Sequence, residues 1–236
     1  MRRDLLAQLR RDVAAKRPVV LVTILATGEG RLLHPFDAST ASDPALLAAA
    51  RQAAERDRSA VVETPAGEVF LRVFNPPVRV VIVGAVHVAQ ALAPMAQLAG
   101  YDVLVVDPRR SFATEERFRG IPLSREWPDE AMARFGLDRR AAVVTMTHDP
   151  KIDDPALAAA LRSEAFYVGA LGSKKTQAAR RERLRALGFG DPDLSRIHGP
   201  VGLSIGAVSP GEIATSILSE LVGCLRRPPG AAGAGA

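Results

Sequence analysis

The stretch "VVIVGAVHVAQ" (residues 80–90) decides the fold of this chain of 236 residues. Four β-branched residues predict a buried strand, and a helix-like segment begins soon after Gly84. This is the form of a dinucleotide-binding corner, whose turn reads G-x-G-x-x-G/A. Gly84 can make the tight turn and Ala89 allows close helix–strand contact, but Val86 replaces the second glycine. A β-branched side chain there intrudes on the phosphate site and rejects positive φ.

The next strand, "DVLVVD" (102–107), supplies a carboxylate at the spacing that a dinucleotide unit needs for ribose hydroxyls. Asp107 ends that strand, 23 residues after Gly84. Arg109 either pairs with Asp107 to discriminate a ribose phosphate or belongs to a solvated loop. His87 opens the helix, either as a neutral ligand-binding group at the helix N-terminus or as a surface residue. Dinucleotide binding and a ligand-free corner both stay open.

Apolar strands alternate with helices from residue 78 onward, which predicts an α/β, Rossmann-like parallel sheet with helices on both faces. The domain is expected over 78–226, after a boundary at "NPP" (75–77). Residues 1–75 predict a small N-terminal α/β domain with a helix capped by Asp43 and a hairpin. The tail 227–236 is rich in Gly, Ala and Pro and is predicted to be disordered.

Composition narrows the class of protein. A net charge of +5 favours anionic ligands, while an aromatic content of only 5% argues against single-stranded nucleic acid. No apolar run is long enough for a membrane helix, and the charged N-terminus does not have the form of a signal peptide. The single Cys224 excludes an internal disulfide and an all-cysteine metal site. We therefore expect a cytoplasmic protein with no nucleic-acid or membrane partner.

The segment "TMTHDPKIDD" (145–154) follows a predicted central strand. Ligands of open α/β sheets collect at the carboxyl ends of the strands, so Thr147, His148 and Asp149 have the right position for binding or proton transfer. Adjacent His and Asp side chains on a loop seldom face the same point, which weakens this signal. We expect Asp153 or Asp154 to cap a helix that begins near residue 154.

Two glycine-containing loops complete the candidate site. In "GALGSKKT" (169–176), Gly172 and the N-cap candidate Ser173 lead into a helix whose first turn carries Lys174 and Lys175. Cations oppose the helix dipole there, so the lysines either hold an anion with the free amides or point to solvent. In "HGPVGLSIGAVSPGEIA" (198–214), a long loop with Gly199 and Gly202 precedes a Ser-Pro-Gly-Glu capping box.

The ordered set of motifs resembles a known family. "VVIVGAVHVAQALAPMAQLAGYDVLVVDPRRSFATEERF", "VVTMTHD", "FYVGALGSKKT" and "RIHGPVGLSIGAVSPGEIATSIL" look like the C-terminal domain of the XdhC/CoxI family, accessory proteins of xanthine dehydrogenase and related molybdenum hydroxylases. The resemblance covers about residues 78–225. Where the family's turn usually reads GAGHVA, this chain has Val86, and residues 1–75 lack the family's SGGC segment, so the chain resembles a shortened member.

The resemblance implies a Rossmann-like domain in a chaperone that binds molybdenum cofactor as cargo and supports its maturation and insertion, rather than an enzyme. No catalytic residue and no metal ligand is assigned. Its implied partners are an apo molybdenum hydroxylase, a cysteine desulfurase and a second copy of the chain in a homodimer. The alternative is an NAD(P)-binding oxidoreductase, and a third interpretation is a scaffold that binds a partner through the basic helix 174–185. The candidate cofactor-binding residues are Gly84, His87, Asp107, Arg109, Thr147, His148, Asp149, Gly172, Ser173, Lys174, Lys175, Gly199 and Gly202.

Overall fold

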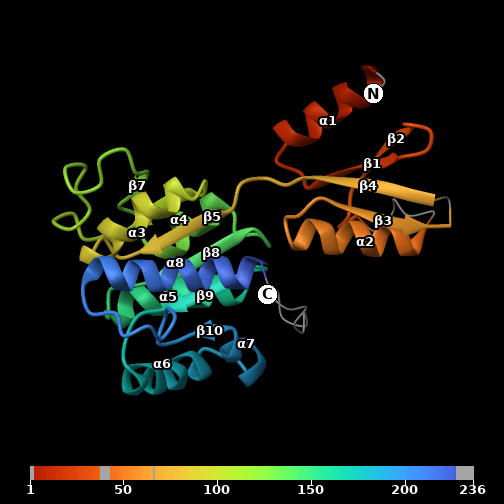
Figure 1. The fold of residues 1–236 in the computed structure, drawn as a ribbon. Coiled ribbons are helices and arrows are strands. Elements are labelled where there is room, and N and C mark those ends of the chain that lie inside the picture. The colour runs from red at the N-terminus through yellow and green to blue at the C-terminus, as the bar shows by residue number, and fades with distance from the viewer. Residues whose placement is uncertain (1–2, 38–42, 66, 227–236) are drawn as a thin grey trace. The chain divides into compact units, whose positions relative to one another are not determined.

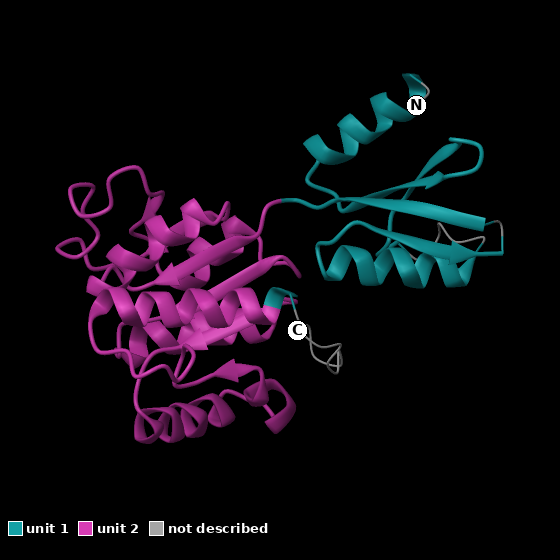
Figure 2. Cartoon of the chain, in the orientation of Figure 1, with its two compact units in different colours: residues 1–76, 225–236 teal, residues 77–224 magenta. Residues whose placement is uncertain are grey.

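The chain forms two compact units in the computed structural model, which describes residues 3–37, 43–65 and 67–226. Unit 1 takes residues up to Pro76 together with those from Leu225 on, and unit 2 spans Pro77–Cys224 (Figure 2). The tail that the sequence predicts to be disordered, 227–236, lies outside the described residues.

Unit 1 is an antiparallel sheet with a helix against it. The strands lie in the order β2-β1-β4-β3, and α2 packs its alanine and leucine face on Val20, Val22 and Leu71. Asp43 caps α2 through its carboxylate, as predicted. The elements are α1 (Arg3–Ala14), β1 (Val19–Ile24), β2 (Gly30–Leu33), α2 (Pro44–Glu55), β3 (Ala60–Thr64) and β4 (Gly67–Phe74).

Unit 2 is a six-stranded, fully parallel sheet in the order β10-β9-β8-β5-β6-β7 (Figure 1). Numbered from β5 in chain order, this is the 3-2-1-4-5-6 arrangement of a doubly wound fold, so the predicted Rossmann-like class is confirmed. The order reverses between the central strands β5 and β8, where such folds bind ligands. The strands are β5 (Arg79–Val83), β6 (Asp102–Val106), β7 (Leu123–Ser124), β8 (Ala141–Thr145), β9 (Tyr167–Ala170) and β10 (Ile197–His198).

The helices of unit 2 cover this sheet, and its central strands are buried. Every residue of β8 is buried, and Val81 and Val143 share a core cluster with Leu157 and Leu161 of α5. This burial on both faces is what a near-continuous apolar strand predicts. The helices are α3 (His87–Leu98), α4 (Pro128–Phe135), α5 (Pro150–Leu161), α6 (Lys174–Ala186), α7 (Asp191–Ser195) and α8 (Pro210–Arg226).

The structure corrects one predicted helix boundary. The helix expected from Asp154 begins at Pro150 instead, and Asp149 is its N-cap, with a carboxylate that accepts from Lys151 N at 2.9 Å. The short elements β2, β7, α4, α7 and β10 had no counterpart in the sequence prediction. Among the described residues, no helix is both long and apolar enough to cross a membrane.

Candidate functional site

The β5–α3 corner fits tightly against the loop that follows β8. Gly84 has φ +112, and a Cβ added to it would lie 2.7 Å from Thr147 Cγ2 and 3.2 Å from Thr147 N. Glycine is therefore required here both for its backbone conformation and for space. The expectation that position 86 needs positive φ is wrong, because Val86 is the extended N-cap of α3 at φ −92. The steric objection to a phosphate at Val86 is unaffected.

Asp107 and Arg109 form a hydrogen-bonded ion pair just after β6. The buried Asp107 carboxylate accepts from Ala85 N at 2.8 Å and from Arg109 N at 3.0 Å. Arg109 also donates through Nε at 2.9 Å and Nη2 at 2.8 Å. Burial raises the pKa of Asp107, but the bonds from Arg109 and Ala85 outweigh it and leave the pKa below its ordinary value. The pairing also raises the pKa of Arg109.

The loop after β8 presents His148 at the reversal point of the sheet. His148 is exposed and has φ +63, a left-handed conformation that is uncommon for a non-glycine residue. Thr147 Oγ1 accepts from Asp149 N at 3.0 Å, which tightens the turn. Left-handed residues that persist without glycine are held by their surroundings and cluster at functional sites.

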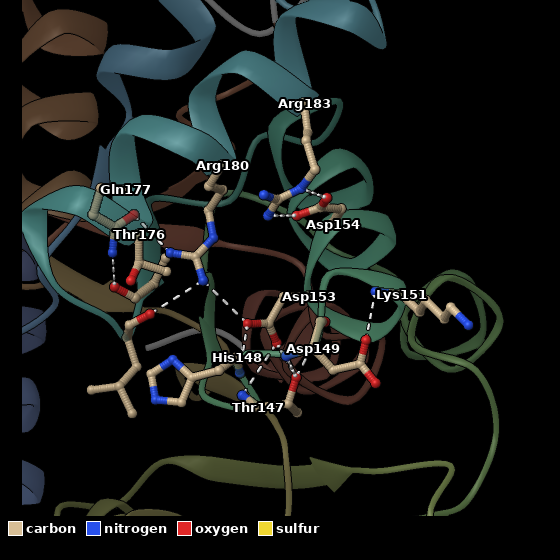
Figure 3. A network of polar contacts seen from close by, with 12 residues as sticks. Thr147, His148, Asp149, Lys151, Asp153, Asp154, Thr176, Gln177, Arg180 and Arg183 are labelled. Atoms are coloured by element: carbon tan, nitrogen blue, oxygen red, sulfur yellow. Dashed lines mark hydrogen bonds and ion pairs between the residues drawn. The ribbon is translucent and has the colours of Figure 1, made fainter.

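The residue that holds this loop is Asp153, in the first turn of α5 (Figure 3). Asp153 Oδ1 accepts from Thr147 N at 3.2 Å and from Thr147 Oγ1 at 2.7 Å, and Oδ2 accepts from His148 N at 3.2 Å. Oδ2 also pairs with Arg180 Nη2 of α6 at 3.2 Å, and both side chains are almost fully buried. The left-handed backbone of His148 is thus fixed by a buried ion pair.

Arg180 extends the contacts to two further loops. Its Nη2 donates to Leu171 O at 3.2 Å and its Nη1 to Gln177 Oε1 at 2.7 Å. Gln177 Nε2 donates to Ala170 O at 2.7 Å, and a Cβ on Gly199 would lie 2.5 Å from Gln177 Cδ. One chain of contacts therefore ties together the loops that follow β5, β8, β9 and β10, all at the carboxyl edge of the sheet. We call it the edge network (Gly84, Thr147, Asp153, Arg180, Gln177 and Gly199).

The N-terminus of α6 lies beside the edge network and carries the two lysines. Ser173 is the N-cap, as predicted, and its Oγ accepts from Thr176 N at 3.2 Å. Gly172 has φ +135, and a Cβ there would lie 3.0 Å from Thr176 Cγ2. Lys174 and Lys175 are exposed in the first turn. Two exposed cations beside the free amides of a helix start can bind an anion together.

The loop between β10 and α8 is anchored by hydrogen bonds near both ends and exposes apolar side chains between them. Gly202 N donates to Glu220 Oε2 of α8 at 2.8 Å, and the predicted capping box is present, with Ser209 N donating to Glu212 Oε2 at 2.8 Å. Between these anchors the loop exposes three apolar side chains, Leu203 (47%), Ile205 (57%) and Val208 (84%). Apolar side chains exposed together at a site are typical of a contact surface.

The structure thus brings some of the predicted site residues together and leaves others on separate loops. Gly84 meets Thr147, Asp107 binds Arg109, and Asp149 serves as a helix cap rather than facing His148. His87 is exposed at the start of α3. Sequence reasoning missed Asp153, Arg180 and Gln177 as parts of the site. Local sequence motifs do not indicate that charged residues such as Asp153 and Arg180 will be buried with several protein partners.

Several curated proteins are similar to this chain. The molybdenum cofactor insertion chaperone PaoD of Escherichia coli K12 is 32% identical over 148 residues, which are 63% of this chain and 40% of PaoD. A Bacillus subtilis 168 protein described as a probable xanthine dehydrogenase subunit is 30% identical over 67% of this chain and 46% of its own length. An uncharacterized protein of E. coli K12, YqeB, is 31% identical over 69% of this chain and 30% of its own length.

The chain therefore spans less than half the length of these curated relatives. A crystal structure described as a xanthine dehydrogenase from Bacillus halodurans has the same fold, with a TM-score of 0.67 and 24% identity over 98% of this chain and 67% of that one. Residues 80–221, which contain the whole edge network, match the family model described as the XdhC Rossmann domain, and the chain belongs to this family.

Proposed function

We propose that this chain binds molybdenum cofactor at the carboxyl edge of its parallel sheet and passes it to a xanthine dehydrogenase-type molybdenum hydroxylase. The cargo is a pterin with a dithiolene and a phosphate. The observation that carries the proposal is the edge network, which fixes four loops around the point where the strand order reverses. A site fixed before binding loses less entropy when its ligand arrives.

Each part of the ligand has a group of matching chemistry at this edge. Lys174 and Lys175 supply positive charge for the phosphate beside the helix amides of α6. His148, exposed on a fixed backbone, supplies a donor and an acceptor for the polar pterin edge. The exposed Leu203 and Ile205 form an apolar cover for the dithiolene or a contact for the recipient enzyme. No bond is made or broken, so we assign no catalytic residue.

The function of PaoD, named as an insertion chaperone, supports the same cargo. We extend the proposal to the partners: an apo molybdenum hydroxylase, a cysteine desulfurase that supplies sulfur, and a homodimer, in the cytoplasm. The alternative of an NAD(P)-binding oxidoreductase is less well supported by the geometry. Asp107 would have to bind ribose hydroxyls, but Arg109 and Ala85 N already occupy its carboxylate.

The test is anaerobic retention of molybdenum cofactor by the purified full chain, measured as molybdenum and pterin after gel filtration. We expect Lys174→Ala with Lys175→Ala to lower retention by about tenfold. A hydrogen bond to a charged group is worth about 1.5–3 kcal/mol, and its contribution is smaller at exposed side chains such as these lysines. Arg10→Ala with Arg11→Ala is the matched control, because it removes two exposed cations from α1 of unit 1.

Equal retention by the lysine variant and the control would contradict the phosphate assignment. Calorimetry with NAD and NADP separates the alternative function, since micromolar binding of either would favour the oxidoreductase.

A further inference from the structure

A second polar cluster of unit 2 takes no part in the edge network. Glu220 and Cys224 lie four residues apart on α8 and so share one helix face, while His198 ends β10. Cys224 Sγ is 3.8 Å from His198 Nε2, and His198 Nδ1 is 3.2 Å from Glu220 Oε1. The imidazole therefore bridges a thiol and a carboxylate through its two nitrogens. Cys224 is partly exposed.

Glu220 is held in place from its other oxygen. Tyr167 Oη donates to Glu220 Oε2 at 2.5 Å and Gly202 N donates to the same oxygen at 2.8 Å, so Oε1 is left for His198. Burial raises the pKa of Glu220, but the bonds from His198, Tyr167 and Gly202 outweigh it and keep the pKa below its ordinary value. A fixed, ionised carboxylate holds the proton on Nδ1, which leaves Nε2 as the nitrogen that faces the thiol and exchanges a proton with it.

The imidazole ring is also fixed. It stacks on Tyr167 with 4.6 Å between ring centroids and 28° between ring planes. Gly169 makes room for this arrangement, because a Cβ there would lie 2.9 Å from Tyr167 Cε1. The contacts with Cys224 and Glu220 raise the pKa of His198 to about 9, so near neutral pH the ring is charged and its Nε2 carries a proton beside Sγ. A nucleophile, a base within reach and a third group that orients the base form the pattern of covalent catalysis.

We propose that Cys224, His198 and Glu220 form a thiol-reactive triad whose substrates are low-molecular-weight disulfides. The one proton shared by the thiol and His198 Nε2 rests on Nε2 while Sγ attacks one sulfur of the disulfide. A new S–S bond forms at Cys224 as the old S–S bond breaks, and the departing sulfur takes the proton back from His198. Cys224 ends as a mixed disulfide and one small thiol is released, so no other oxidant or reductant is needed.

The triad adjoins the edge network through His198, which precedes Gly199, and through Glu220, which accepts from Gly202 N, but Cys224 itself takes no part in the network. The glycine-containing loop ends where α8 begins at Pro210, and Cys224 lies about 21 Å further along the helix axis at 1.5 Å per residue. Labelling at Cys224 and retention of molybdenum cofactor can therefore be measured independently, and the failure of one leaves the other standing.

The test uses the full chain and the neutral probe 4,4′-dithiodipyridine at neutral pH. Cys224 is the single cysteine, so released thiopyridone reports on it alone. We expect the folded chain to react at least about tenfold faster than the chain unfolded in urea, because a positioned base contributes about 10²–10⁴-fold and partial burial reduces this gain. His198→Gln should remove the gain, and mass spectrometry should show one adduct per chain.

Glu220 acts through His198, so it is a positioning residue. Glu220→Gln should slow labelling, and the double variant with His198→Gln should be no slower than His198→Gln alone. Ser219→Ala, an exposed neighbour on α8, is the matched control and should react as the unchanged chain does. A folded chain that reacts no faster than the unfolded one would overturn the proposal. A folded His198→Gln variant, checked by circular dichroism, that keeps the full rate would do the same.

Discussion

Two carboxylate–arginine pairs hold loops at the carboxyl edge of unit 2, and they differ in kind. Asp107 and Arg109 are two residues apart, and the Arg109 side chain is 30% exposed and stacks on Phe112 with 4.3 Å from its guanidinium carbon to the ring centroid. Asp153 and Arg180 are 27 residues apart, on α5 and α6, with side chains 1% and 2% exposed. The first pair is a local loop structure, whereas the second joins two helices.

The difference shows which contacts can change when a ligand binds. Arg109 can leave Asp107 at a lower cost than Arg180 can leave Asp153, because water reaches the Arg109 guanidinium and Ala85 N stays bonded to the carboxylate. Arg180 cannot leave Asp153 without leaving two buried charges unpaired, one of them the carboxylate that holds the amides of Thr147 and His148. We therefore regard the Asp153–Arg180 pair as the fixed frame of the site and the Asp107–Arg109 pair as its adjustable part.

The largest effect is expected from Asp153→Ala. It leaves Arg180 buried without its carboxylate and removes the acceptor for the loop after β8, which should cost about 3–5 kcal/mol of unfolding free energy. Urea denaturation measures this loss. Asp154→Ala is the control, because its partner Arg183 is half-exposed and the loss should be about 1 kcal/mol or less. Equal losses for the two variants would show that burial of the arginine partner does not decide the cost.

A smaller loss is expected from Asp107→Asn. The variant weakens the bonds from Ala85 N and Arg109, and we expect it to cost about 1.5–3 kcal/mol, as for hydrogen bonds to a charged group. The same denaturation experiment applies. Asp102→Asn, at the exposed start of β6, should change stability little. If Asp107→Asn cost more than Asp153→Ala, the ranking of the two pairs would be reversed.

The pH dependence of Asp107 follows from the direction of its pKa. Because the folded pKa lies below the reference value of 3.8, ionised Asp107 adds stability that is fully present above that value. The contribution is lost as pH falls through the folded pKa. The stability gap between the unchanged chain and Asp107→Asn should therefore shrink between pH 7 and about pH 2. A gap that did not change with pH would show that the charge of Asp107 is not what holds Arg109.

The smallest effect on stability is expected from Lys174→Ala with Lys175→Ala. These exposed cations stand at the positive end of α6, where each costs about 0.3–1 kcal/mol at most. The variant should be slightly more stable than the unchanged chain while it retains less cofactor. Thermal unfolding measures the first effect and gel filtration the second. A clear loss of stability would show that the two lysines stabilise the fold, as the Asp153–Arg180 pair does.

The doubly wound sheet was predictable because it depends on local signals. Apolar strands, helical segments, the N-caps Asp43 and Ser173 and the capping box of α8 all act within a few residues. "DPKIDDP" shows where such signals fail. Asp149 and Asp154 both precede a proline, so local rules allow either as the cap. In the structure Asp149 is the cap, whereas Asp153 and Asp154 pair with Arg180 and Arg183 of another helix, which no local rule indicates.

The short strands β7 and β10 escaped prediction for the same reason. Each is two residues long, and its pairing with a neighbouring strand defines it. The sequence indicated no role for Cys224 in a site. Its proximity to His198 depends on the packing of α8 on β10, which no sequence pattern within α8 indicates.

The contact between Gly84 and Thr147 has a consequence for how this domain can vary. A methyl group at position 84 would collide with the Thr147 side chain and with the backbone behind it. The residue that each of these two positions can accept, 63 residues apart in the sequence, therefore depends on the residue at the other. A smaller residue at position 147 would relieve the side-chain collision but not the strain of a side chain at the φ of +112 that Gly84 adopts. Engineering of the proposed cofactor site should leave the contact between Gly84 and Thr147 untouched.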